Sequence, residues 1–101
     1  MTKFKLLSNE IDMIINLKNS RIPEIFKSDY LDHLLTVENI HFYLTEDLLS
    51  RKTIKYDLTE EFKDLQKTIT LEKLDENAKH YYSNLVSVFE IYKKYYGSSI
   101  N

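Results

Sequence analysis

The stretch that decides the fold is LEKLDENAKHYYSNLVSVFEIYKKYYG, residues 71–97. Its apolar residues recur three and four positions apart, and this spacing predicts one long helix over residues 71–95. At about 1.5 Å per residue, such a helix would be roughly 39 Å long. Gly97 occupies the position that favours glycine at a helix C-terminus, and Lys93 and Lys94 in the last turn complement the helix dipole.

Three further segments have the helical spacing of apolar residues. Residues 2–18 predict a first helix, which ends before Pro23 because the residue that precedes a proline is pushed away from helical angles. Residues 29–50 predict a second helical unit, and a break near Thr36 is left open. Residues 58–69 predict a third helix.

Capping signals stand near the predicted helix starts. Thr2 is a candidate N-cap for the first helix. Asp57 and Glu60 have the spacing of a capping box at the start of the third, with Asp in place of the usual Ser or Thr. Pro23 is suited to the first position of a short helical turn.

The composition favours an all-α domain. The 101 residues include one glycine and one proline, whereas sheet-rich domains need turn residues about every 8–12 positions. We therefore expect residues 1–101 to form a single helical domain, a small antiparallel bundle of about four helices with a long C-terminal helix. An α+β alternative with a small hairpin around residues 40–58 stays open, because apolar residues alternate there as in strands: Ile40, Phe42, Leu44, Ile54, Tyr56 and Leu58.

The composition also excludes several classes of protein. The absence of cysteine excludes disulfide scaffolds, thiolate zinc sites and cysteine nucleophiles, and a single glycine excludes phosphate-binding loops. No stretch approaches the ~18 consecutive apolar residues of a membrane span, and the first residues lack the apolar core of a signal peptide. We expect a cytoplasmic protein without a membrane span or a cofactor.

The predicted last helix is apolar over an unusually wide arc. Apolar residues cover about 220° of its circumference, against the ~100° that faces a single core. One interpretation is a central helix packed on two or three neighbours. The other is that its end projects beyond the bundle, where Tyr92, Tyr95 and Tyr96 bind a partner protein. A homodimer that pairs the broad face of this helix is a further alternative.

The net charge of −2 hides an uneven distribution. Residues 28–50 contain no Lys or Arg, and their acidic residues are Asp29, Asp32, Glu38, Glu46 and Asp47. A surface of this kind favours a partner protein with a basic surface, because opposite charge steers the encounter. The alternative interpretation is a solvated helix face whose acids pair with lysines elsewhere in the fold.

No catalytic or metal site is predicted. Glu38 and His41 have the Glu-x-x-His spacing of di-iron helical bundles, but those sites need two such motifs and further glutamates. The sequence contains no second Glu-x-x-His. No serine lies in a Gly-x-Ser-x-Gly elbow, so the sequence does not indicate an enzyme.

Nucleic-acid binding is disfavoured, because a footprint on phosphates needs clustered Lys and Arg. The largest local group of cations is Arg51, Lys52 and Lys55. If a hairpin formed over residues 40–58, these side chains would lie on a wing. A small winged-helix DNA-binding regulator is therefore kept as an alternative function.

In length and helical pattern, the chain is similar to small immunity proteins of bacteriocin systems and to small phage or plasmid regulators. The similarity is one of size and architecture, so no functional residue is carried over from it. The leading hypothesis is a non-catalytic intracellular protein that binds another protein and inhibits, protects or regulates it.

Overall fold

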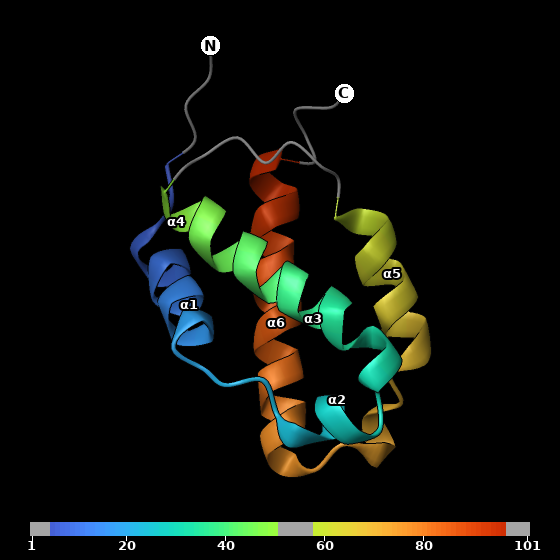
Figure 1. Cartoon of the computed structure of the whole chain (residues 1–101). Coiled ribbons are helices and arrows are strands. Elements are labelled where there is room, and N and C mark those ends of the chain that lie inside the picture. Colours follow the sequence, from blue (N-terminus) through green and yellow to red (C-terminus); the bar gives the residue numbers. More distant parts are fainter. Residues whose placement is uncertain (1–4, 51–57, 97–101) are drawn as a thin grey trace.

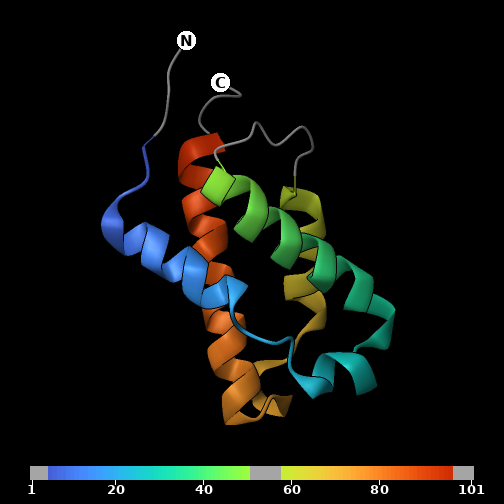
Figure 2. The same ribbon diagram turned by 60° about the vertical axis from the view of Figure 1, so that its left-hand side comes forward.

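The long helix α6 (Glu76–Tyr96) packs against other helices on three sides (Figure 1). The computed structural model describes residues 5–50 and 58–96. Helices α1 (Ser8–Lys18) and α5 (Thr59–Thr68) flank α6. Helix α5 runs antiparallel to α6, α1 crosses it obliquely, and α3 (Leu34–Phe42) crosses over it between them (Figures 1 and 2). None of the described residues forms a strand, so the expected all-α bundle is confirmed.

Short helical elements complete the described chain. They are α2 (Glu24–Ser28), the 3₁₀ turn η1 (Leu31–His33), the π-helical turn η2 (Tyr43–Asp47), α4 (Leu48–Ser50) and the 3₁₀ turn η3 (Leu71–Lys73). The elements η1, α3, η2 and α4 follow one another without an intervening loop. They form one bent helical arm that lies across α6.

The first helix begins later than the sequence predicts. Helix α1 starts at Ser8, and Leu7 before it is extended, with φ −76° and ψ 157°. An apolar Leu7 side chain offers no acceptor for the first backbone N–H groups. Instead, the Glu10 carboxylate accepts the Leu7 backbone N–H at 2.9 Å, which fixes the helix start at this point. Thr2 lies outside the described residues, and the predicted helix end before Pro23 is confirmed.

The second helical unit is continuous through Thr36, so no break occurs there. The alternative of a hairpin around residues 40–58 is contradicted over residues 40–44, because these residues belong to α3 and η2. Ile40 and Leu44 are four residues apart and fully buried, whereas Phe42 points outward and is 56% exposed. The apparent alternation therefore arises because Ile40 and Leu44 lie on the buried face of the helix and Phe42 lies on its opposite side. Ile54 and Tyr56, the second half of the predicted hairpin, lie outside the described residues.

The third helix agrees with its prediction. The apolar residues spaced along it are buried: Leu58, Phe62, Leu65 and Ile69. The rings of Phe62 and Phe89 stack with their centroids 4.1 Å apart, which joins α5 to α6. Asp57, the predicted cap, lies outside the described residues.

The last helix is shorter than predicted. It starts at Glu76, because the Asp75 carboxylate accepts the Ala78 backbone N–H at 2.8 Å as an N-cap. Leu74 before it is extended and buried, while Leu71 lies in η3 and is 55% exposed. At 21 residues, α6 is about 31 Å long. Gly97 lies outside the described residues.

The broad apolar face of α6 is the centre of the core. Its buried members are Ala78, Tyr81, Tyr82, Leu85, Val88, Phe89, Ile91 and Tyr92. Neighbouring helices of the same chain cover this face, as the interpretation of a central helix requires. The homodimer alternative, which pairs this face with a second copy, stays a prediction.

Candidate partner-binding surface

Among the predicted partner-binding tyrosines, Tyr92 belongs to the core. It is 4% exposed, and its hydroxyl accepts the backbone N–H of Leu58 at 3.3 Å. The prediction that Tyr92 projects from the bundle is therefore wrong, because its side chain is buried beside Leu58, the residue before α5. Tyr95 is half-buried and contacts the start of α1, and Tyr96 is the last residue of α6.

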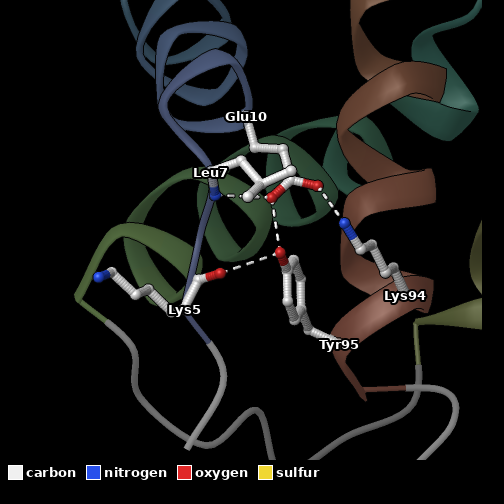
Figure 3. A network of polar contacts seen from close by, with 5 residues as sticks. All are labelled: Lys5, Leu7, Glu10, Lys94 and Tyr95. Carbon is white, nitrogen blue, oxygen red and sulfur yellow. Dashed lines mark hydrogen bonds and ion pairs between the residues drawn. The ribbon is translucent and has the colours of Figure 1, made fainter.

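Tyr95 belongs to a polar network around Glu10 (Figure 3). The Glu10 carboxylate accepts hydrogen bonds from the Tyr95 hydroxyl at 2.6 Å, from the Lys94 ammonium at 2.9 Å and from the Leu7 N–H at 2.9 Å. The Tyr95 oxygen also lies 3.1 Å from the Lys5 carbonyl. The network joins the start of α1 to the last turn of α6.

The network explains why a carboxylate is stable inside the fold. Glu10 is 6% exposed, and burial by itself would raise the pKa of its carboxyl group. The hydrogen bonds from Tyr95, Leu7 and Lys94 outweigh burial and lower the pKa below the ordinary 4.5. Glu10 is therefore ionised at neutral pH with its oxygens already bonded. Its hydrogen bonds connect the start of α1 to the end of α6, and both carboxylate oxygens already accept hydrogen bonds within the fold.

A second polar contact lies between α3 and α6. The His41 Nδ1 atom and the Tyr81 hydroxyl are 2.7 Å apart. Burial lowers the pKa of His41, against the effect of a hydrogen bond to the Lys18 backbone, and burial raises the pKa of Tyr81. Both pKa shifts are consistent with a neutral His41 imidazole that accepts a hydrogen bond from the Tyr81 hydroxyl. The pair satisfies two polar groups within the core and does not resemble a general base facing a pocket.

The acidic residues of the cation-free stretch are not equivalent. Glu46 forms an ion pair with Lys18 at 3.1 Å, so it is matched within the fold. Asp47 is half-buried in η2. Asp29, Asp32 and Glu38 are exposed, and none of them forms an ion pair with a cation in residues 5–50 or 58–96. Among ion pairs of the described residues, the alternative of internal pairing thus applies to Glu46 only.

Apolar side chains accompany these three acids on the outside of the helical arm. Leu31 is 62% exposed, Leu35 is 67% exposed, and Phe42 continues the row. Leu35 and Phe42 are seven residues apart and therefore lie on one side of α3, with Glu38 between them. We call Leu31, Asp32, Leu35, Glu38 and Phe42 the α3 surface.

The apolar part of this surface was not predicted from the sequence. The spacing of apolar residues could have indicated this surface. The buried residues of the arm lie on one side of the helix, whereas Leu35 and Phe42 lie on another side of it; the buried residues are Val37, Ile40, Leu44 and Leu48.

A shallow hollow of about 340 Å³ adjoins one end of the α3 surface. Residues 28–33 and Thr68 line it, so Asp29 and Asp32 both contribute to its wall. The Tyr30 hydroxyl accepts the Thr70 N–H at 3.4 Å, a long contact that connects this corner to the end of α5. The hollow is open to solvent and carries acidic groups, which suits a cationic side chain better than a neutral substrate.

The other features considered in the sequence give no further candidate site among the described residues. No group of three or more His, Asp or Glu residues there is arranged to hold a metal ion. Glu38 is exposed while His41 bonds to Tyr81, so this pair does not converge. None of the described helices combines the length and apolar content that crossing a bilayer requires. Arg51, Lys52 and Lys55 lie outside the described residues.

Comparison with known proteins gives no relative: no family model, no curated protein and no solved structure matches this chain.

Proposed function

We propose that this chain is a non-catalytic, cytoplasmic protein that binds another protein through the α3 surface and thereby inhibits, protects or regulates it. One observation carries the proposal. Leu31, Leu35 and Phe42 are each more than half exposed on the outside of the helical arm. An apolar row of this kind, rimmed by polar residues, is typical of a protein–protein contact.

The state of the polar residues supports a binding role over catalysis. Catalysis needs titratable groups that converge on a pocket with free donors or acceptors. Two titratable groups of the described chain, Glu10 and His41, already bond to other parts of the fold. Among the exposed acids, Asp32 and Glu38 belong to the α3 surface and Asp29 adjoins it, so charge can contribute to partner choice there.

The experiment is a comparative capture from the native cell. The wild-type chain and a Leu35→Ser, Phe42→Ser variant are immobilised, and the proteins that each retains are quantified by mass spectrometry. We expect one partner to be retained by the wild type and reduced at least about tenfold by the variant, because central apolar residues dominate binding energy.

Leu7→Ser is the matched control, because Leu7 is 53% exposed, close to the value for Phe42, and lies at the start of α1 rather than on the helical arm. The control variant should retain the partner at the wild-type level. If both variants retain the same proteins as the wild type, the α3 surface is not the binding site and the proposal is wrong.

A further inference from the structure

We infer that the α3 surface receives a cationic amphipathic helix of the partner protein, with one of its Arg or Lys side chains in the hollow lined by Asp29 and Asp32. This inference rests on the proposed function and specifies the partner's chemistry. It joins two features that the fold places side by side, the apolar row and the acidic hollow.

The dimensions of the apolar row match a short helix. Leu35 and Phe42 are seven residues apart within α3, which is about 10.5 Å along the helix, and Leu31 lies in η1 just before α3. A partner helix of two turns or more can cover this length with apolar residues at every third or fourth position. The row is formed by rigid helical backbone, so little order has to be created when the partner binds.

The charge around the row selects a cationic partner. Glu38 lies between Leu35 and Phe42, and Asp32 follows Leu31 directly. Residues 28–50 contain no Lys or Arg, so an anionic partner would meet no compensating cation from this arm. A helix with Lys or Arg on either side of its apolar stripe places opposite charges next to both acids.

The hollow adds a defined position for one cation. Leu31 and Asp32 belong both to the hollow's wall and to the α3 surface, so a helix on the row passes its edge. Asp29 contributes a second carboxylate to the same wall. A long Arg or Lys side chain can extend from the helix into the hollow while its aliphatic part stays against Leu31.

The same charges disfavour the other macromolecules that bind exposed helical faces. Nucleic acids and anionic membranes present phosphate groups, and Asp29, Asp32 and Glu38 would repel them. The apolar row alone would allow many partner proteins to bind. The acidic residues beside it favour proteins with basic surfaces over the others.

The test is a selection from a displayed library of helical peptides about 15 residues long, or roughly four turns. The peptides carry a fixed apolar stripe, and the positions beside the stripe are randomised among Lys, Arg, Glu, Gln and Ser. The full-length protein serves as bait, and the Leu35→Ser, Phe42→Ser variant removes background binders. We expect the selected peptides to be enriched in Lys and Arg beside the stripe.

The hollow is tested with the tightest selected peptide by fluorescence anisotropy. Asp29→Asn with Asp32→Asn should weaken its binding about three- to tenfold, and added salt should shrink the difference. Glu61→Gln with Asp64→Asn is the matched control, because both acids are exposed on α5 and the change in charge is the same. An equal loss in the control would mean that the effect is one of net charge, and the hollow would not be the cation site.

The outcomes separate this inference from the proposed function. If the selected peptides are neutral or acidic but depend on Leu35 and Phe42, the α3 surface binds protein and the cationic inference is wrong. If no peptide prefers the wild type to the Leu35→Ser, Phe42→Ser variant, and the capture experiment also fails, both are wrong. If light scattering at tens of micromolar shows a dimer that the variant abolishes, the occupant is a second copy and the inference is overturned.

Discussion

The Tyr95 hydroxyl donates a hydrogen bond of 2.6 Å to the Glu10 carboxylate across 85 positions of sequence. The contact closes the bundle at the end where α1 begins and α6 finishes (Figure 3). Because the acceptor is a buried anion, the bond is charge-assisted and stronger than a bond between neutral groups. The first two predictions concern this contact.

Tyr95→Phe should lower the free energy of unfolding by about 1–2 kcal/mol, because it removes a hydrogen bond to a charged group and keeps the ring. Urea unfolding followed by circular dichroism measures the change. Tyr30→Phe is the control, since the Tyr30 hydroxyl makes only one long contact of 3.4 Å at an exposed site. A loss no larger than that of the control would show that the Tyr95–Glu10 bond does not stabilise the fold.

The stability of the wild type should fall on acidification below pH 4.5, where Glu10 begins to be protonated in the unfolded chain. The pKa of folded Glu10 is lowered from its ordinary 4.5 by hydrogen bonds from Tyr95, Leu7 and Lys94 that outweigh burial. Its stabilising effect is therefore complete above 4.5 and is lost as the pH falls through the lower folded pKa.

Glu10→Gln isolates this effect. The variant should be less stable than the wild type at pH 7, and the difference should shrink between pH 4.5 and pH 3. Urea unfolding at a series of pH values measures both. A difference that stays constant over this range would mean that the folded and unfolded pKa values of Glu10 are equal.

The burial of His41 should cause a second pH dependence of the free energy of unfolding, at less acidic pH. Burial holds the pKa of His41 below its ordinary 6.5, although a hydrogen bond to the Lys18 backbone partly opposes this. The unfolded chain therefore takes up a proton before the folded one, and stability should decrease as the pH falls below 6.5. We expect this slope to be smaller in His41→Gln.

Tyr81→Phe separates burial from hydrogen bonding at His41. The variant loses the 2.7 Å contact with Nδ1 but keeps an aromatic ring over the imidazole. Burial is the main cause of the lowered pKa of His41. The free energy of unfolding of Tyr81→Phe should therefore still decrease between pH 6.5 and the pKa of folded His41. Loss of the slope in Tyr81→Phe would contradict that cause.

The α3 surface should tolerate polar substitution. Leu35→Ser should change the free energy of unfolding by less than about 0.5 kcal/mol, because the side chain is mostly in solvent. Leu85→Ala, on the buried face of α6, should cost about 2–5 kcal/mol. Thermal unfolding of the two variants gives both values. A large cost for Leu35→Ser would place Leu35 in the core and remove it from any docking surface.

The regular part of the fold could be predicted from the sequence because it depends on local spacing. Three- and four-residue repeats located α5 and most of α6, and the residue type at Pro23 located the end of α1. The helix starts could not be predicted as well. Glu10 and Asp75 set them through side-chain contacts with the backbone, and the periodic apolar pattern runs past both points.

The candidate surface was predicted only in its charge. The absence of Lys and Arg from residues 28–50 is a property of the sequence, so the acids were found. Whether Leu35 faces the core depends on the rotation of α3 against α6, which local spacing does not determine. Likewise, Tyr92 and Tyr95 have similar neighbours in sequence, but Tyr92 is buried and bonds to Leu58, whereas Tyr95 bonds to Glu10 of α1.

The Glu10 network also determines how the fold opens. Fraying the last turn of α6 would withdraw Tyr95 and Lys94 together and leave a buried carboxylate bonded only to Leu7. An unpaired buried anion is costly, so we expect the first turn of α1 to open in the same event. The two ends of the described chain, far apart in sequence, should therefore open as one unit, and their amide hydrogens should share a common free energy of opening.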